Sequence, residues 1–356
     1  MPLSGNKGEW SEIYTLFKLL AEKKLFIGDE HQQRIEDLYY PIIQVLRYED
    51  ENKITYTVKE NIVIQTNDND TFSVNVARFR EKSLELLRLI RENNGAFELP
   101  TIERFMNEVR CTKLKADSTD KADIKIVIHD QRTQTDHLLG YSIKSYLGGT
   151  PTMINASGST NFNYKVVGLD KAAVERINAI DSRSKIQDRI EAIYAEGGQL
   201  VFDKVASSTF SNNLMLVDSL LPTIVAEMLL CKFHKGQSLI SDICNELSRT
   251  NPCRFDLEGN PYFYQYKIKR FLLEAALGMI PNTAWNGNYD ANGGYIVVRS
   301  DGEVICYHIY DKTLFENYLF NKTKLDTPSS SRHGFGIIEI ENGEMFFKLN
   351  LQVRFI

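Results

Sequence analysis

The chain contains 356 residues, of which 43% are hydrophobic and 25% charged, so it can bury a sizeable core and is not expected to be globally disordered. Its formal net charge of −5 argues against a uniformly basic nucleic-acid-binding protein. The longest apolar stretch, residues 220–231, is interrupted by Pro222, Thr223 and Glu227, and no apolar run follows a basic segment at the N-terminus. We therefore expect neither a membrane span nor a secretory signal.

In the first third of the chain, the sequence patterns predict helices separated by short strands. Apolar residues recur at helical spacing over residues 8–24. Residues 29–51 follow, where seven acids and two arginines give a local charge of −5, so the rest of the chain is neutral overall. The next patterns predict strands over 53–58 and 61–65 and helices over 76–92 and 100–110.

A hairpin is the next predicted feature. A β-branched run over residues 124–128 predicts one strand, a polar turn of about eight residues follows, and residues 138–146 predict the second strand. A third strand is predicted over 162–167. Residues 142–168 contain no acid and only two lysines, so this stretch can lie against phosphate groups without repulsion.

The remainder is predicted to be mostly helical from residue 170 to about 247, with a further helix over 263–277 and two C-terminal hairpins, 295–309 and 336–349. Strands early and late with helices between them indicate a mixed α/β or α+β fold. Because no clear linker is visible, we expect one compact unit, with a core over residues 1–170, a helical subregion over 171–280 and a hairpin subregion over 281–356.

The cysteines and histidines show no metal-binding spacing. The five cysteines are scattered without a CxxC pair, and the six histidines form no HxH or HxxxH pair. We expect reduced thiols in a cytoplasmic protein, and no cysteine zinc site or histidine cage.

A candidate catalytic group lies in the predicted hairpin. Because side chains alternate along a strand, Ser142 and Lys144 point the same way, and Asp123 begins the neighbouring strand. A metal-assisted phosphodiester hydrolase needs a carboxylate to bind a hard cation such as Mg²⁺ and an ammonium to orient water or stabilise phosphoryl charge. The alternative is an exposed hairpin with ordinary surface charges.

The first predicted helix offers further carboxylates. Glu9 and Glu12 lie three residues apart on one side of that helix. A glutamate near a helix start is usually a partner of the helix dipole, and the alternative role is a ligand of a metal ion or its water.

Several short sequences together carry a resemblance to a known family. They are residues 7–12 (KGEWSE), 121–124 (KADI), 140–145 (GYSIKS), 155–162 (NASGSTNF), 329–336 (SSSRHGFG) and 348–355 (KLNLQVRF). In combination they resemble type II restriction endonucleases of the HpaII family. The resemblance implies the PD-(D/E)XK nuclease fold, a mixed sheet flanked by helices, and Mg²⁺-dependent cleavage of double-stranded DNA at a short palindrome, CCGG, between the two cytosines.

The resemblance also assigns roles. Asp123 would be the metal-binding acid and Lys144 the motif lysine, whereas Ser142 stands where the general pattern has Asp or Glu. This departure leaves the metal site one carboxylate short. Glu12 is the candidate to replace the missing ligand, and the backbone carbonyl of Ile143 could supply another oxygen.

Amides, hydroxyls and basic groups after the lysine strand are candidates for DNA contact, although such clusters are also typical of plain loops. The candidates are Asn155, Ser157, Ser159, Thr160, Asn161, Lys165, Arg332 and His333, with Lys322 and Lys324 nearby. The aromatic and basic run over residues 262–270 has helical spacing, so we interpret it as core packing with a basic outer face, not as a base-stacking platform.

These inferences predict a Mg²⁺-dependent restriction endonuclease that acts on duplex DNA as a homodimer, because a twofold protein matches a palindromic site. Two alternatives remain open at this point. One is a structure-specific repair or junction-resolving nuclease of the same fold, and the other is a non-catalytic DNA-binding protein on the nuclease scaffold.

Overall fold

The computed structural model describes residues 2–50, 52–66, 70–115 and 122–356. By contacts the chain divides into two compact units, Met1–Pro151 with Tyr289–Tyr318, and Thr152–Asn288 with Leu319–Ile356. These boundaries differ from those expected near residues 170 and 280. The difference arises because a late hairpin pairs with an early strand, which spacing along the chain does not reveal.

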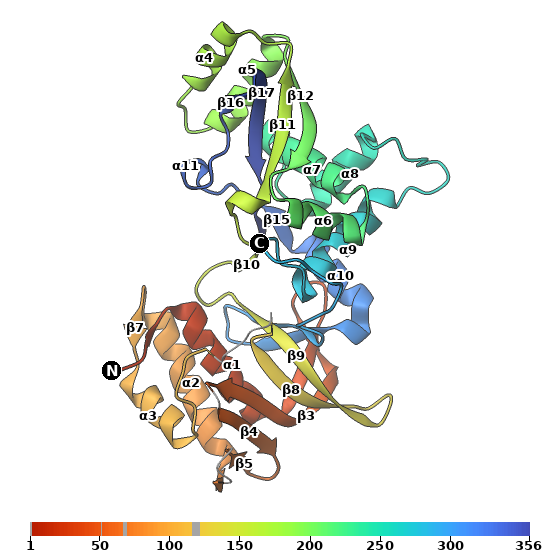
Figure 1. Cartoon of the computed structure of the whole chain (residues 1–356). Helices are drawn as coiled ribbons and strands as arrows, with labels where there is room; N and C mark the ends of the chain where they lie inside the picture. The colour runs from red at the N-terminus through yellow and green to blue at the C-terminus, as the bar shows by residue number, and fades with distance from the viewer. Residues whose placement is uncertain (1, 51, 67–69, 116–121) are drawn as a thin grey trace. The chain divides into compact units, whose positions relative to one another are not determined.

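Unit 1 contains a large sheet and its helices (Figure 1). Its elements are β1 (Ser4–Gly5), α1 (Lys7–Glu22), β2 (Lys24–Gly28), β3 (Arg34–Glu49), β4 (Asn52–Val58), β5 (Ile62–Gln65), β6 (Thr71–Val74), α2 (Val76–Glu92), β7 (Phe97–Glu98), α3 (Pro100–Glu108), β8 (Ile124–Asp130), β9 (Thr135–Ser145), β13 (Gly294–Val298), β14 (Val304–His308) and most of α10 (Lys312–Asn321).

The sheet of unit 1 is mixed and closes on itself. Its order is β2-β14-β13-β9-β8-β3-β4-β5-β6, and β2 also pairs with β3, so six of the strands form a barrel. Closure depends on the 16-residue β3, whose first half pairs with β2 and whose second half pairs with β8 and β4. β13 runs parallel to β9 and β14 runs parallel to β2, whereas the other pairs are antiparallel.

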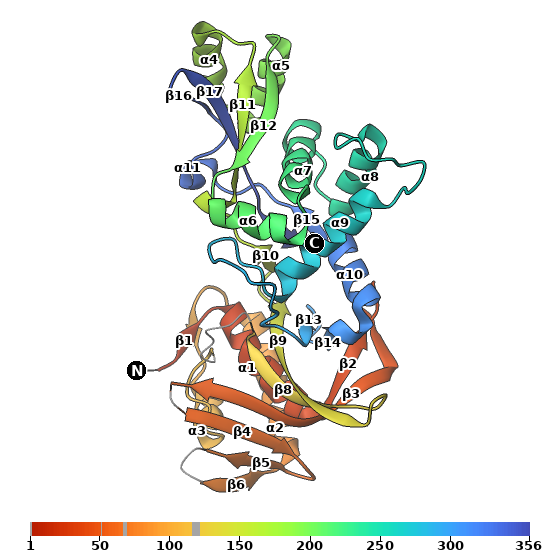
Figure 2. The same ribbon diagram turned by 45° about the vertical axis from the view of Figure 1, so that its right-hand side comes forward.

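Helices α1, α2 and α3 lie together beside this sheet (Figures 1 and 2). The buried face of α1 presents Trp10, Ile13 and Phe17 to the core, and the ring of Phe17 contacts Phe79 of α2 and Phe105 of α3 edge-on. The predicted spacing of apolar residues in the first helix is therefore the spacing that builds the core of unit 1.

Unit 2 contains two smaller sheets and most of the helices. Its elements are β10 (Thr152–Ile154), β11 (Asn161–Val167), α4 (Lys171–Asn178), α5 (Lys185–Ala195), β12 (Gln199–Val205), α6 (Ser208–Val217), α7 (Leu221–Lys235), α8 (Ile240–Thr250), α9 (Phe263–Leu277), β15 (Thr323–Leu325), α11 (Ser330–His333), β16 (Ile338–Glu341), β17 (Glu344–Asn350) and β18 (Val353–Phe355). The sheet orders are β12-β11-β17-β16 and β10-β18-β15.

The apolar segment 220–231 lies in the buried first part of α7, apart from Leu220, which precedes the helix and is exposed. No single helix in the described part of the chain is long and apolar enough to cross a membrane. Only α6 and α7 taken together pass that test, by length and composition, and they are bent by 107° at their junction.

The mixed α+β class expected from the sequence is confirmed, and several elements match closely. α2 and α9 have the predicted bounds, and residues 263–277 place their apolar residues in the core as expected. One expectation was wrong. The hairpin turn between β8 and β9 spans four residues, 131–134, because the polar residues around it still form ladder pairs. The tract from residue 170 to 247 is mostly helical as expected, with β12 inserted between α5 and α6.

Candidate active site

The two glutamates near the start of α1 have different surroundings. Asn6 caps the helix by accepting hydrogen bonds from the backbone N–H groups of Gly8 and Glu9, and Glu9 Oε2 accepts one from Asn6 N at 2.8 Å. This capping box satisfies donors that the first turn leaves open. Glu9 is therefore the partner of the helix start, whereas Glu12 lies one turn further on and is half-buried.

Strands β8, β9 and β13 position the predicted catalytic residues of the hairpin. Ile124 pairs with Tyr141, so Asp123, which precedes β8, lies beside Ser142. On the other side of β9, Ser142 pairs with Tyr295 and Lys144 pairs with Val297. Lys121, the first residue of the KADI sequence, lies outside the described residues.

Asp123 is fixed by two donors from β9. Its Oδ2 accepts a hydrogen bond from Ile143 N at 2.7 Å and another from Ser142 Oγ at 3.0 Å. The backbone N–H of Asp123 donates to Tyr141 O at 2.8 Å. Ser142 is only 2% exposed, so its hydroxyl is committed to orienting Asp123. Ser142, which stands where the general nuclease pattern has Asp or Glu, thus supports the carboxylate of Asp123.

Lys144 shares this environment. Burial lowers the pKa of its ammonium, and the negative charges of Asp123 and Glu12 act in the opposite direction. Its Nζ also lies 5.0 Å from the centroid of the Tyr295 ring, which offers a cation–π contact. The lysine is therefore held within electrostatic reach of both carboxylates.

Glu12 carries the strongest electrostatic sign of a shared site. Burial and the nearby charge of Asp123 raise the pKa of Glu12 to about 8, while the positive charges of Lys115 and Arg47 act to lower it. Two carboxylates in one half-buried place repel each other unless a proton or a cation joins them. The fold thus brings Glu12 to Asp123 and Lys144, although Glu12 is far from both along the chain.

The donor set fits a hard divalent cation. The parallel ladder, with Tyr146 N donating to Val298 O, turns the backbone groups of even-numbered residues of β9 toward β13. The carbonyl of Ile143 consequently faces the other side, where its N–H already meets Asp123. Among the residues that the structure describes, no three His, Cys, Asp or Glu side chains gather, so other ligands would be backbone, water or substrate oxygens.

Sequence reasoning missed a buried ion pair that binds residues 112 and 113, just after α3. Arg47 Nε donates to Glu49 Oε1 at 2.5 Å, and Arg47 Nη2 donates to Lys113 O at 2.5 Å. Glu49 Oε2 accepts from both the backbone N–H and the hydroxyl of Thr112 at 2.7 and 2.6 Å. Both residues of this pair belong to the acid-rich segment 29–51. That they bind residues 112 and 113 is visible only in the folded structure.

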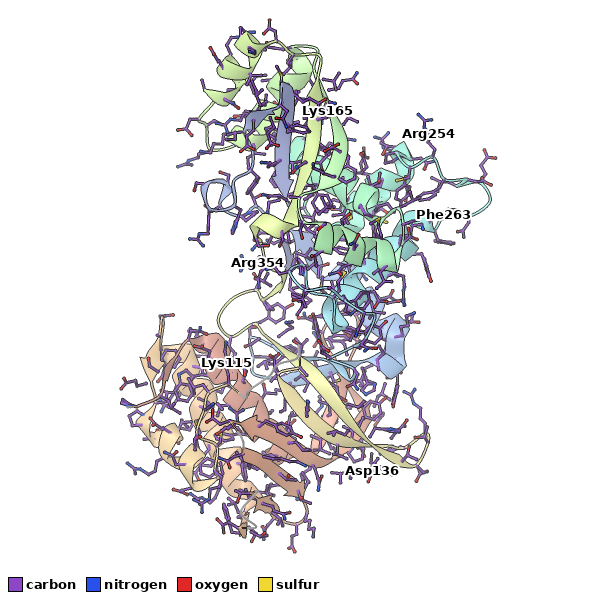
Figure 3. The ribbon with its side chains drawn as sticks, in the orientation of Figure 1. Lys115, Asp136, Lys165, Arg254, Phe263 and Arg354 are labelled. Carbon is purple, nitrogen blue, oxygen red and sulfur yellow. The ribbon has the colours of Figure 1, made fainter. Side chains whose placement is uncertain are left out.

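Lys115 is a second residue that sequence reasoning missed. Its Nζ lies 3.7 Å from Glu9 Oε1, and Figure 3 shows it near α1. Three lysines in the segment 113–121 were a visible signal, but their proximity to the first helix was not.

The predicted DNA-contact residues all belong to unit 2, whereas the predicted catalytic residues belong to unit 1. Thr160 and Asn161 are buried within a network of the chain's own polar groups. Thr160 Oγ1 donates to Ser157 O at 3.0 Å, and Asn161 Nδ2 donates to His333 O at 2.9 Å. Asn350 Nδ2 completes the network by donating to Asn161 Oδ1 at 2.7 Å. Their side chains therefore hold the local structure together.

The other candidates lie nearer the surface. Asn155 is exposed, and the hydroxyls of Ser157 and Ser159 are 2.6 Å apart. Lys165, labelled in Figure 3, forms an ion pair with Glu344. Arg332 is exposed in α11, and His333 is half-buried next to it.

Comparisons with known proteins identify the family of the chain. The family model described as HpaII restriction endonuclease matches residues 6–355. The type II restriction enzyme HpaII of Haemophilus parainfluenzae is 45% identical over 357 residues, covering 99% of each chain. No solved structure matches. The chain belongs to the HpaII restriction endonuclease family and is, like this relative, a type II restriction enzyme.

Proposed function

We propose that the protein cleaves double-stranded DNA at a short palindrome, CCGG, by Mg²⁺-dependent hydrolysis on a PD-(D/E)XK scaffold. The observation that carries this proposal is the convergence of Asp123, Glu12 and Lys144 at one end of β8 and β9, with each carboxylate acting on the charge state of the lysine. A DNA-binding protein without catalysis has no need for that convergence.

The metal ligands in this proposal are the carboxylates of Asp123 and Glu12 and the carbonyl of Ile143. With Asp123 Oδ2 bound to Ser142 and Ile143, Oδ1 is the oxygen assigned to the ion. When bound, Mg²⁺ would polarise the scissile phosphate and acidify water. Ser142 keeps the carboxylate in place, as supporting residues around metal sites do.

Lys144 is assigned to the attacking water and the phosphoryl oxygens. Its ammonium orients the water and stabilises the negative charge that grows on the phosphate in the transition state. In-line attack then breaks the bond to the 3′-oxygen and leaves a 5′-phosphate.

For recognition we propose Asn155, Ser157 and Ser159 as groups that read base edges, with Lys165, Arg332 and His333 at phosphates or guanine. Thr160 and Asn161 are assigned to holding this segment. We further propose that the two units act as one nuclease, that two chains bind one palindrome, and that the enzyme works in the cytoplasm.

The decisive experiment digests a plasmid of known sequence with and without Mg²⁺ and sequences the fragment ends. Discrete fragments with 5′-phosphates at CCGG are expected only with the metal. Cleavage confined to branched substrates would instead favour a structure-specific nuclease, and binding without cleavage would favour a non-catalytic scaffold.

Two variants test the residues. Asp123→Ala should lose Mg²⁺-dependent cleavage, and Lys144→Ala should bind duplex DNA while its cleavage rate falls about a thousandfold, because each removes a group used at the reacting phosphate. Single-turnover cleavage with gel-shift binding measures both effects. Wild-type rates in either variant would contradict its role.

A further inference from the structure

Unit 2 contains a cavity of about 600 Å³, and the residues that line it have been assigned no role so far. It is lined by the start of α5 and residues 183–184 before it, by the last part of α7, and by residues 327–330, which lead into α11. Its volume is in the range of sites that hold a nucleotide-sized ligand.

The charge of the lining has one sign. Arg183, Lys185 and Lys232 line the cavity, and no acidic residue does. Hydroxyl donors accompany them, from Ser329 and Ser330 among others. A cavity with several cations and hydroxyls and no carboxylate in its lining has the chemistry of an anion site.

Of these cations, Lys185 is ion-paired, whereas Lys232 meets a neutral hydroxyl and is acted on by the charge of Asp326. Lys185 Nζ pairs with the exposed Asp181 at 2.9 Å, and Lys232 Nζ donates to the neutral hydroxyl of Ser238 at 2.8 Å. Because Lys232 is half-buried, its ammonium has lost part of its hydration, which an anion would replace.

A buried arginine of α5, the helix that carries Lys185, adds to the positive charge near the cavity. Arg189 of α5 is 7% exposed and donates to the carbonyls of Gly336, Asn178 and Ile180. Within the described ranges no carboxylate forms an ion pair with it. Its charge is solvated by neutral backbone dipoles, although the charge of Asp181 also acts on it, so it contributes to the potential around α5.

We infer that this cavity binds a backbone phosphate of the DNA duplex, outside the bases that are read. The inference rests on the proposed DNA substrate. Duplex DNA presents a phosphate with its sugar, which suits the size of the cavity, and the residues after Ser330 carry the exposed Arg332 that was assigned to DNA on other grounds. The cavity and Arg332 would thus form one phosphate-binding surface.

The test uses the full chain with Lys144→Ala to prevent cleavage. Binding of a labelled 30-base-pair duplex is followed by fluorescence anisotropy between about 50 and 200 mM KCl. The double variant Arg183→Gln/Lys232→Gln should weaken binding about tenfold at low salt. It should also reduce the slope of log Kd against log salt by about 1, equally for duplexes with and without CCGG.

The matched control is Lys204→Gln/Arg254→Gln, which removes two exposed cations of the same unit that do not line the cavity (Arg254 is labelled in Figure 3). A slope for the double variant equal to that of the control would overturn the inference. Should Lys232→Gln prevent folding, Arg183→Gln/Lys185→Gln at the surface repeats the test.

Plasmid cleavage by the wild-type enzyme is recorded alongside. No cleavage and no duplex binding would overturn the proposed function. Cleavage with an unchanged salt slope in the cavity variants would overturn only the phosphate site.

Discussion

Glu9 and Glu12 show how two identical side chains, three residues apart, take different tasks. Glu9 closes the capping box with Asn6, so its carboxylate is satisfied by the start of α1. Glu12 takes no part in this capping box. Burial, and after it the nearby charge of Asp123, raises the pKa of Glu12 to about 8. The helix-dipole role that the sequence offered for either residue therefore belongs to Glu9.

This division predicts the behaviour of Glu12→Gln. The amide keeps the shape of the side chain but cannot offer a carboxylate to Mg²⁺, so the cleavage rate should fall at least about a hundredfold. Thermal stability without metal should stay the same or rise, because the substitution removes a repelled carboxylate.

Single-turnover kinetics and circular dichroism melting measure the two effects. Glu9→Gln is the control and should show the reverse pattern, with a lower melting temperature and near-normal cleavage. If Glu12→Gln cleaves normally and melts early, Glu12 is a structural residue of the helix.

At the scale of elements, β3 connects the barrel to the residues that follow α3. Its Arg47–Glu49 pair is almost fully buried, with 6% and 4% of the two side chains exposed. The pair binds the backbone of residues 112 and 113, which lie between α3 and the segment that leads to β8. Side chains of β3 thus fix the backbone just after α3.

Glu49→Ala should therefore cost about 3 kcal/mol or more of unfolding free energy, because it leaves the Arg47 guanidinium buried without its counter-ion. Denaturant unfolding measures the change. Glu92→Ala breaks the exposed Arg88–Glu92 pair and should cost less than about 1 kcal/mol. Equal effects of the two substitutions would show that burial of the Arg47–Glu49 pair contributes nothing.

At the scale of the whole molecule, the closed barrel of unit 1 buries a titratable group. His308 at the end of β14 is 0% exposed and lies against the rings of Tyr40, Tyr141 and Tyr310. Its Nδ1 accepts a hydrogen bond from Tyr310 N at 3.0 Å. Burial lowers the pKa of His308 from 6.5 to about 4, although Asp311 and Asp130 act in the opposite direction.

Between pH 6.5 and 4 the unfolded chain binds a proton at this position that the folded chain does not bind. The unfolding free energy should therefore fall as pH decreases through this window, by up to about 3 kcal/mol from His308. Melting temperatures across the window, compared with those of His308→Asn, measure this share. Parallel pH profiles for the two proteins would contradict it.

The sequence alone determined the features that depend on neighbours along the chain. The periodicity of apolar residues predicted the bounds of α2 and α9, and a β-branched run predicted β8 with Asp123 at its start. Alternation along the next strand placed Ser142 and Lys144 on one face of β9. These signals are local because helix and strand repeats are set by backbone geometry within a few residues.

Only the tertiary structure decided what the site contains and how the chain divides. The pairing of β13 with β9 placed Tyr295 beside Lys144, and the packing of α1 brought Glu12 to Asp123. The same kind of packing buried Thr160 and Asn161, whose composition resembles an exposed loop. Contacts between residues more than a hundred positions apart leave no periodic trace, because they are chosen by the burial of whole surfaces and not by local backbone geometry.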